Sequence, residues 1–290
     1  MANPIRKQLQ ILYERLKVPG KLVSLFLRVT GIYKRGFKNA HDLRLHRHEL
    51  IFDKLPPVFD GYTMMVMSDL HIDSDLYLVP EIKKLMTEHP TDVVLFLGDY
   101  RFRLTGAYDV VLSRMSELFD AARVKDGIYA IRGNHDPREL MQHFPGLGAR
   151  VLDNQSIKIE KKGESIYIIG VDEPHYDKAD DLPAATENLP DHALKILLAH
   201  TSEIYKEAEA LGIDLYLCGH THGGQICLKK FGPVITNVHA PRHFASGFWR
   251  YKNMRGFTST GVGISSVPVR FNCPPEIVLF TLRTDNHATD

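Results

Sequence analysis

Seven side chains with metal-binding chemistry follow short apolar runs between residues 69 and 222. In open α/β sheets, loops at the carboxyl ends of neighbouring strands converge on one crevice, so we expect these side chains to meet there. Carboxylate, imidazole and amide ligands without thiolates suit Mn, with Fe or Zn as alternatives. The candidate metal ligands are Asp69, His71, Asp99, Asn134, His200, His220 and His222.

The spacing of these residues fits one shared site. Asp69 and His71 are two residues apart, so on an extended segment they face the same side, and His220 and His222 repeat this spacing. We expect the carboxylate of Asp99 to bridge two ions with its two oxygens. Sharp turns close to the site require glycine, and three glycines precede ligand positions. They are Gly98, Gly133 and Gly219.

The ordered motifs Asp-x-His, Gly-Asp, Gly-Asn-His-Asp, His and Gly-His-x-His resemble those of the calcineurin-like metallophosphoesterase superfamily over about residues 48–283. The resemblance implies an α/β fold of four layers, an αββα sandwich of two mixed sheets. It also implies two divalent transition metal ions. The first would be held by Asp69, His71, Asp99 and His222, and the second by Asp99, Asn134, His200 and His220.

The same resemblance implies a role for His135, the imidazole of the third motif. It would bind no metal and would lie near the leaving group, where it can donate a proton. We therefore expect His135 and Asp99 to be the catalytic residues. Residues 55–61, 219–225, 261–263 and 268–276 look like the bacterial branch with YkuE-type phosphodiesterases and one class of UDP-2,3-diacylglucosamine hydrolase.

The chemistry expected of two close cations is hydrolysis of a phosphodiester or pyrophosphate bond. We predict a lipid-linked substrate such as UDP-2,3-diacylglucosamine at the membrane face. A soluble nucleotide-type phosphodiesterase is the alternative, and a non-catalytic binding module is a further one. Loss of ligands would favour the binding module, whereas here every ligand position is filled.

Candidate substrate-binding residues flank the ligands. Asn134 lies among them, and the guanidinium groups of Arg101 and Arg103 could clamp a phosphate. Arg132 and Arg138 have the same potential, although a surface charge is the favoured explanation for each arginine taken singly. Asp172, Glu173 and His175 follow a predicted strand, and we expect a polar loop there, with a position at the rim of the site as the alternative. His239 and His243 are expected to be structural or rim residues.

Apolar runs rich in Val, Ile and Leu alternate with segments of helical length, which predicts α/β layering around buried sheets. The predicted strands are residues 63–67, 93–97, 128–131, 166–169, 195–199 and 215–218. The predicted helices are residues 79–88, 107–122 and 202–211. Strands predicted at 234–235, 256–259 and 277–282 suggest a second sheet from the last third of the chain.

The charge is divided unevenly along the 290 residues. Residues 1–48 carry eleven Lys/Arg and two acids, a net charge of +9, whereas the rest carries 25 Lys/Arg and 33 acids, a net charge of −8. We predict a basic helical segment over 1–48, a metallophosphoesterase domain over 49–284 and a polar tail over 285–290. The total net charge of +1 predicts no strongly charged partner such as nucleic acid, whereas the uneven distribution predicts an acidic surface as the partner of the basic segment. The expected phosphoester chemistry predicts a phosphorylated lipid or nucleotide-type small molecule as the substrate.

Residues 4–35 are expected to form two short amphipathic helices separated by Pro19-Gly20. Basic amphipathic helices suit peripheral contact with an anionic membrane. Packing of their apolar faces on the domain explains the pattern equally well. The apolar stripes are Ile5, Leu9, Leu12 and Leu16 in the first helix and Leu22, Leu25, Phe26, Val29 and Tyr33 in the second.

The three cysteines have no Cys-x-x-Cys spacing, which predicts neither a disulfide framework nor a thiolate zinc site. The longest apolar run of the N-terminal segment, residues 22–33, is interrupted and too short to span a bilayer. We therefore predict a cytoplasmic location, with peripheral contact at the inner membrane.

Overall fold

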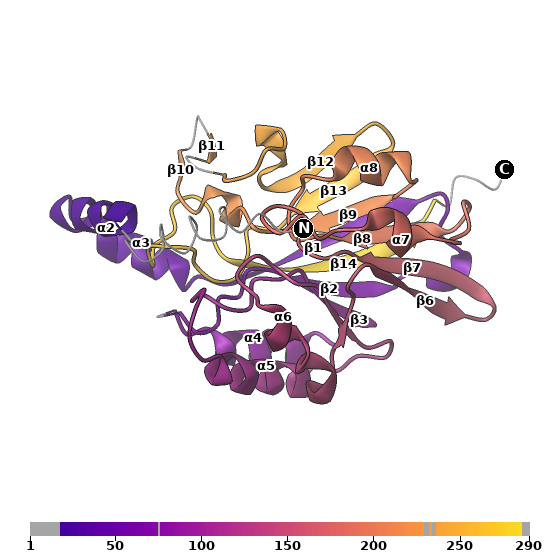
Figure 1. Cartoon of the computed structure of the whole chain (residues 1–290), viewed down its shortest axis with the longest axis horizontal. Helices are drawn as coiled ribbons and strands as arrows, with labels where there is room; N and C mark the ends of the chain where they lie inside the picture. The colour runs from indigo at the N-terminus through magenta and orange to yellow at the C-terminus, as the bar shows by residue number, and fades with distance from the viewer. Residues whose placement is uncertain (1–17, 75, 229–231, 234–235, 286–290) are drawn as a thin grey trace.

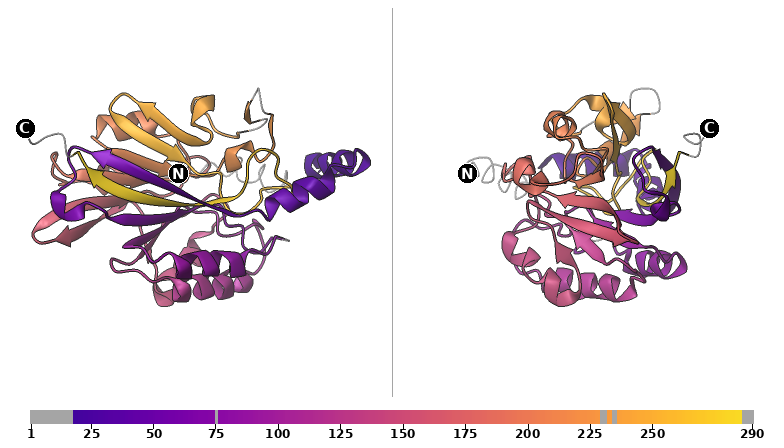
Figure 2. Two further views of the ribbon diagram at one scale, coloured as in Figure 1. Left: turned by 180° about the vertical axis from the view of Figure 1, so that it is seen from behind. Right: turned by 90° about the vertical axis from the view of Figure 1, so that its right-hand side faces the viewer.

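The computed structural model describes residues 18–74, 76–228, 232–233 and 236–285. Two six-stranded mixed sheets lie face to face (Figures 1 and 2). In spatial order the first sheet consists of β1 (Arg44–Phe52), β14 (Glu276–Thr284), β2 (Thr63–Met67), β3 (Val93–Phe96), β4 (Ile128–Ala130) and β5 (Arg150–Val151). The second consists of β12 (Gly247–Tyr251), β13 (Met254–Thr258), β9 (Leu215–Cys218), β8 (Leu194–Leu198), β7 (Glu164–Gly170) and β6 (Gln155–Lys161).

The central strands are parallel and buried on both faces, which explains their continuous apolar sequences. In β2, Met64 and Val66 point into the core between the sheets, whereas Met65 and Met67 pack with the helices outside the first sheet. The register pairs β2 with β3 in parallel and β14 with β2 in antiparallel orientation. In the second sheet, β7, β8, β9 and β13 are parallel neighbours.

Helices cover both outer faces, so the predicted four-layer αββα sandwich is confirmed (Figure 2). The first sheet is covered by α4 (Val79–Glu88), α5 (Asp109–Ala121) and α6 (Arg138–Met141). The second is covered by α7 (Leu182–Thr186) and α8 (Tyr205–Ala210). Shorter elements are η1 (Pro57–Phe59), η2 (Phe144–Leu147), η3 (His222–Gly224), η4 (Arg242–Phe244), β10 (Cys227–Leu228) and β11 (Gly232–Pro233).

The second sheet is not formed by the last third of the chain alone, contrary to the prediction. β14 inserts between β1 and β2 of the first sheet, while β12 and β13 extend the second sheet beside β9. Sequence periodicity predicts a strand but does not contain its pairing partners, so it does not assign the strand to a sheet. The strand predicted at 234–235 lies outside the described residues.

The described part of the N-terminal segment differs from the prediction, because the second predicted helix is divided between two helices. The first predicted helix, with its Ile5 to Leu16 stripe, lies outside the described residues. α2 (Val18–Val29) includes Pro19-Gly20 in its first turn, where proline is tolerated, and α3 (Tyr33–Ala40) follows it. The predicted boundary after residue 48 falls inside β1, which pairs along its whole length with β14.

Candidate metal centre

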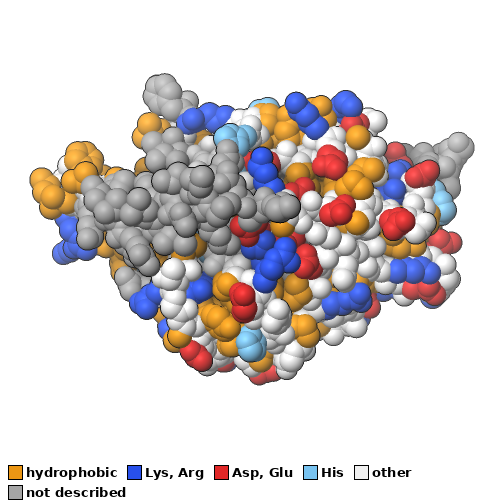
Figure 3. Space-filling view, in the orientation of Figure 1, with side chains coloured by type: hydrophobic (Ala, Val, Ile, Leu, Met, Phe, Trp, Pro, Cys, Tyr) orange, Lys and Arg blue, Asp and Glu red, His pale blue; other side chains and the backbone are white. Residues whose placement is uncertain are grey.

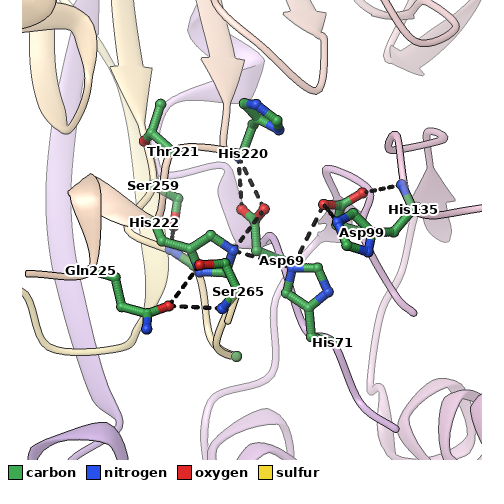
Figure 4. Close-up of polar contacts among 12 residues, drawn as sticks. Asp69, His71, Asp99, His135, His220, Thr221, His222, Gln225, Ser259 and Ser265 are labelled. Carbon is green, nitrogen blue, oxygen red and sulfur yellow. Dashed lines mark hydrogen bonds and ion pairs between the residues drawn. The ribbon is translucent and has the colours of Figure 1, made fainter. Parts of the chain in front are cut away.

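The expected ligands converge at the carboxyl ends of strands from both sheets (Figure 4). Two groups of three side chains, each with ligand atoms within 4.8 Å of one another, form there. The first cluster is Asp69, His71 and His222, and the second cluster is Asp99, His200 and His220. All of them except His220 are at most 3% exposed, and the ring of His220 is half-buried.

Within the first cluster, imidazole nitrogens face each other and a carboxylate. The Nε2 atoms of His71 and His222 are 3.1 Å apart, and His222 Nε2 is 3.6 Å from Asp69 Oδ1. The His71 ring donates its Nδ1–H to the carbonyl of Arg101 at 2.8 Å, which leaves a lone pair on Nε2. A backbone carbonyl that fixes the tautomer in this way is typical of metal-binding histidines.

The second cluster shows the same arrangement. His200 donates its Nδ1–H to the Leu97 carbonyl at 2.7 Å, and its Nε2 is 3.1 Å from Asn134 Oδ1. His220 donates Nε2–H to the Asn237 carbonyl at 3.2 Å, so its lone pair is on Nδ1. That Nδ1 atom is buried and has no hydrogen-bond partner among the described residues. Asn134 therefore joins the second cluster.

Asp99 lies between the two clusters. Its Oδ2 atom is 3.6 Å from Nε2 of His71 and 3.4 Å from Nε2 of His200. Its other oxygen, Oδ1, accepts the backbone N–H of His135 at 2.9 Å. One carboxylate oxygen, Oδ2, is therefore within reach of both groups of ligands, whereas the sequence predicted a bridge that uses both oxygens.

Strained backbone places these side chains. Asp69, His71, Asp99, His220 and His222 all have positive φ, between 41° and 69°, where residues other than glycine are rare. Such conformations cost about 1–3 kcal/mol each and concentrate at functional sites. The surrounding packing must therefore hold them.

The predicted close approach of two backbone segments explains why residue 133 is a glycine. A Cβ on Gly133 would lie 2.3 Å from both the backbone nitrogen and Oδ1 of Asp99. At Gly98, φ is +91°, and a Cβ would lie 2.5 Å from the nitrogen of Gly133. Any other residue at either position would push apart the segments that carry Asp99 and Asn134.

Asp136 holds the Asp99 segment through backbone amides. Its Oδ2 accepts the N–H groups of Asp99 at 2.7 Å and Gly133 at 3.0 Å, and its Oδ1 accepts those of Tyr100 at 3.0 Å and Arg101 at 3.2 Å. Burial and the charge of Asp99 raise the pKa of Asp136 to about 7, against the effect of these amides. Asp136 is the fourth residue of the Gly-Asn-His-Asp motif, but the motif did not predict this role.

The electrostatics of the clusters favour cation binding. Burial lowers the pKa of His71 to about 4 and that of His220 to about 3, and it holds the pKa of His222 well below its ordinary value. These three rings are therefore neutral near pH 7 and can offer lone pairs. Burial opposes a charged His200, but the charge and hydrogen bond of Asp99 raise the pKa of His200 to about 10.

The carboxylates complete this picture. Burial alone would raise the pKa of Asp99, yet His200, His135 and His71 lower it well below its usual range. Burial raises the pKa of Asp69 to about 6, and the charge of Asp99 adds to this rise. The second cluster thus holds a positive charge beside Asp99, which a divalent cation would supply in place of the His200 proton. Together with the orphaned Nδ1 of His220, the donor set fits two divalent ions.

His135 lies beside the clusters but in neither of them. Its ring centroid is 4.8 Å from that of His71, its Nε2 is 4.0 Å from Asp99 Oδ2, and its Nδ1 contacts the Phe102 carbonyl at 2.9 Å. Its side chain is 10% exposed, so the ring lies beside the clusters and is partly accessible to solvent.

The arginines differ from one another in their surroundings. Arg101 is buried, donates to the Gly106 carbonyl at 2.7 Å and has a buried Nε without a partner among the described residues. Arg103 is exposed. Arg132 is buried against Asp172 and Asp177, at 2.5 and 2.7 Å.

Arg138 pairs with Asp172 and with Asp153. Carboxylates therefore already neutralise Arg132 and Arg138. The sequence had predicted each of them to be either a phosphate clamp or a surface charge.

The loop after β7, expected to be a plain polar loop, is buried and highly ordered by hydrogen bonds. Glu173 accepts the N–H groups of His175, Tyr176 and Asp177, each at 2.7 Å. His175 is 7% exposed, and its ring centroid lies 5.3 Å from that of His220. No spacing signal in the sequence connects this loop with the motif at residues 219–222.

Arg270 also lies at the site, although the sequence motifs did not predict a role for it. It is fully buried, its Nη1 donates to the Thr260 carbonyl at 2.9 Å, and its Nη2 donates to the Gly261 carbonyl at 3.0 Å and lies 3.4 Å from His222 Nδ1. A charged residue inside the apolar run 267–271 was the available signal.

Comparison with known proteins identifies the family. The profile described as "Calcineurin-like phosphoesterase" matches residues 62–224, which contain all seven candidate ligands. The uncharacterized protein YpbG of Bacillus subtilis is 35% identical over 278 residues, covering 92% of this chain and 97% of YpbG.

Two further relatives carry descriptive names. The uncharacterized metallophosphoesterase YkuE of Bacillus subtilis is 27% identical over 286 residues, covering 92% of this chain and 95% of YkuE. The phosphodiesterase YaeI of Escherichia coli is 28% identical over 250 residues, covering 82% of this chain and 87% of YaeI.

Proposed function

Because this chain belongs to the calcineurin-like phosphoesterase family and is a phosphoester hydrolase, we propose that it hydrolyses a phosphodiester or pyrophosphate bond with two divalent metal ions. The observation that carries the proposal is the position of Asp99. Its Oδ2 lies 3.6 Å from one cluster's imidazole and 3.4 Å from the other's, as a bridging carboxylate requires. The name of the relative YaeI, a phosphodiesterase, supports the choice of bond.

The assignment of ligands follows the two clusters. Asp69, His71, Asp99 and His222 would hold the first ion, and Asp99, Asn134, His200 and His220 the second. Two such ions, with Mn²⁺ proposed as the native metal, would lower the pKa of water and neutralise the charge that develops on the phosphoryl oxygens. The backbone carbonyls of Arg101, Leu97 and Asn237 each accept one ring N–H, so that in the neutral rings the other nitrogen of His71, His200 and His220 is the one that would bind metal.

His135 is the proposed general acid. The Phe102 carbonyl orients its ring through Nδ1, and the other edge faces Asp99, beside the space where the substrate would lie. A proton donated from this ring would stabilise the leaving oxygen. Among the candidate substrate-binding residues, Asn134 lies at the second cluster. Arg103 is exposed and lies close to Asp99 in the sequence. Arg101 points to Gly106, so its proposed part is to support that loop.

The finer proposal is a lipid-linked substrate such as UDP-2,3-diacylglucosamine, met at a membrane face by a member of the YkuE-type branch. The identity to YkuE over 92% of the chain supports the branch. Support for the membrane comes from α2, which projects from the domain and exposes hydrophobic side chains at that end of the molecule (Figures 1 and 3). Leu22, Phe26 and Val29 are 61%, 64% and 79% exposed, whereas Leu27 packs against Val267 and Val269.

Basic residues accompany this exposed face. Arg28, Lys34, Arg35 and Lys38 are exposed on α2 and α3. Each cation near an anionic bilayer contributes about 1 kcal/mol. No described helix is long and apolar enough to cross a membrane. No observation on the described residues favours the alternative of a soluble nucleotide-type phosphodiesterase.

The proposal is tested on purified full-length protein with Mn²⁺ and bis(p-nitrophenyl) phosphate. We expect close to two ions per chain, and we expect Asp99→Ala to lose most of the metal and the activity, because both clusters share this carboxylate. Asp53→Ala, at an exposed position after β1, is the matched control. Full metal content and full rate in Asp99→Ala would exclude the bridging assignment.

A further inference from the structure

Arg270 is a buried cation beside the first cluster. Its side chain is fully buried, and a guanidinium stays charged inside a protein. All of the oxygen atoms at hydrogen-bond distance from it are backbone carbonyls. They belong to Thr260 at 2.9 Å, Gly261 at 3.0 Å, Gly263 at 2.5 Å and Cys273 at 3.3 Å. Three of these carbonyls come from one loop, residues 260–263, which follows β13.

Loop 260–263 lies directly against the segment that carries Asp69. The N–H groups of its last two residues donate to the carbonyls of Ser68 at 2.9 Å and of Asp69 at 2.7 Å. A Cβ on Gly261 would lie 2.7 Å from Cβ of Asp69. The loop therefore touches both the backbone and the side chain of this candidate ligand, whose φ of 52° is one of the strained values at the site.

The guanidinium and the Asp69 segment hold this loop from two sides. Three carbonyls of the loop accept from Arg270, while two of its N–H groups donate to the Asp69 segment. Without the guanidinium these carbonyls would lose their donors, and buried groups left without partners are costly. Nη2 of Arg270 also lies 3.4 Å from Nδ1 of His222, so the same side chain contacts the ligand that the second sheet contributes to the first cluster.

The backbone of Arg270 is anchored to α3. Its N–H donates to the Gly36 carbonyl at 2.9 Å, and its carbonyl accepts Nδ2–H of Asn39 at 2.9 Å. A Cβ on Gly36 would lie 2.6 Å from the ring of Phe271 and 2.8 Å from Val269, so α3 packs closely on the segment around Arg270. The guanidinium thus extends from a fixed backbone.

An arginine suits this position because its five donors form a rigid fork, whereas a lysine has its three donors on one nitrogen. We propose that Arg270 is a positioning residue for the first metal ion, whose guanidinium holds loop 260–263 so that the loop keeps Asp69 in the geometry that binds this ion. The inference rests on the proposed pair of metal ions and adds a residue outside the ligand set that determines the affinity of one of them.

The first test compares Mn²⁺ binding by the full-length wild type and by Arg270→Lys, both freed of metal beforehand. Lysine keeps the charge but cannot span the carbonyls that the fork reaches. By calorimetric titration we expect the affinity for one ion to fall about 10–100-fold and the affinity for the other to stay unchanged. At a Mn²⁺ concentration that fills both sites of the wild type, the electron paramagnetic resonance spectrum should change from that of a coupled pair to that of isolated Mn²⁺. Arg250→Lys makes the same change at an exposed position on β12 and should match the wild type.

Hydrogen–deuterium exchange of the metal-free proteins, followed by mass spectrometry, tests the positioning without any metal. The N–H groups of residues 262 and 263 report on the loop, because they bond to the Asp69 segment. In Arg270→Lys we expect faster exchange there and unchanged exchange at residues 99–101, whose N–H groups are held by Asp136. A loss of stability of the whole domain would accelerate exchange at both places.

Two further variants separate geometry from charge and from folding. If Arg270 acted through its charge alone, Arg270→Lys would bind both ions like the wild type, and Arg270→Gln would bind one ion more tightly, because a cation that repels Mn²⁺ would be gone. Asn39→Ala removes only the bond to the Arg270 carbonyl, at a partly exposed position on α3. It is the milder variant if Arg270→Lys does not fold, and we expect a smaller loss of affinity for the same ion.

The outcomes distinguish this inference from the proposed function. Failure of the wild type to bind two ions would refute the proposed metal centre, and the exchange experiment would still decide on Arg270. Wild-type affinities for both ions in Arg270→Lys, or wild-type exchange at residues 262 and 263, would overturn the positioning role. Weaker binding of both ions, or faster exchange at residues 99–101 as well, would also overturn it, because Arg270 would then support the domain as a whole.

Discussion

Replacement of Asp136 by asparagine removes half of the acceptor capacity that holds the Asp99 segment. The carboxylate is 1% exposed and accepts four backbone N–H groups, two on each oxygen. The asparagine amide has one oxygen, and its NH₂ group cannot accept. In either orientation, two of the N–H groups from Asp99, Gly133, Tyr100 and Arg101 lose their acceptor and meet a donor instead.

The expected loss follows from the hydrogen bonds. A bond to an ionised group contributes about 1.5–3 kcal/mol, so two lost bonds correspond to about 3–6 kcal/mol of unfolding free energy. Because the pKa of Asp136 is raised to about 7, its charge is incomplete near neutral pH, and we expect the lower end of this range. A shift of the strained Asp99 backbone should also weaken metal binding, by about 10–100-fold.

The assay measures both effects separately. Urea unfolding of metal-free protein, followed by circular dichroism, gives the free energy of unfolding, and calorimetry gives the Mn²⁺ affinity. Asp53→Asn makes the same chemical change at an exposed position and should alter neither. If Asp136→Asn matched Asp53→Asn in both measurements, the hydrogen-bond argument would be refuted.

Two further predictions concern His135 and α2. His135→Ala should keep its metal while kcat falls about 10²–10⁴-fold, and the loss should be smaller for nitrophenyl esters, whose leaving groups need little protonation. His192→Ala is the control, and an equal loss on every leaving group would indicate a positioning role for His135 instead. Leu25→Gln with Phe26→Gln should reduce sedimentation of the full-length protein with anionic liposomes about tenfold, as measured at low salt, whereas Val110→Gln, an exposed apolar position on α5, should have no effect. Equal sedimentation of the Leu25→Gln/Phe26→Gln variant and the Val110→Gln variant with liposomes would contradict membrane contact through α2.

The membrane test uses substitutions because the fold rules out a simple truncation. A chain that began near residue 48 would lack the first part of β1, whose residues Arg44 to His48 pair with Glu276 to Phe280. Its instability would be unrelated to lipid binding. The sequence did not reveal this strand, because its alternation of Arg, His and Leu gives half-buried positions without a continuous apolar run.

The local parts of the fold were predictable, and their assembly was less so. The bounds of β2, β9 and α4 agree with the prediction, because buried parallel strands and an amphipathic helix have clear local patterns. The edge strands β5, β6 and β12 were not predicted, since the short β5 and the half-exposed β6 and β12 carry weak signals. The placement of β14 depends on its pairing with β1 and β2, which no local pattern encodes.

The candidate site likewise has parts that local sequence patterns predict and parts that depend on contacts between distant segments. The sequence predicted seven candidate ligands at one site because each follows a strand end, and the structure places six of them in two adjacent clusters, with Asn134 beside the second. The supporting residues were less predictable. Asp136 and Arg270 act through contacts between segments far apart in the chain, and only the three-dimensional packing shows these contacts.

The division of each cluster between the two sheets has a consequence for how the site forms. In the first cluster, Asp69 and His71 follow β2 of the first sheet and His222 follows β9 of the second. The second cluster combines Asp99, after β3, with residues after β8 and β9. Neither sheet alone can build a complete cluster, so the distances between the candidate ligands are set by the apolar core between the sheets. Because such cores are close-packed, the stability of this interface and the geometry of the centre depend on the same side chains.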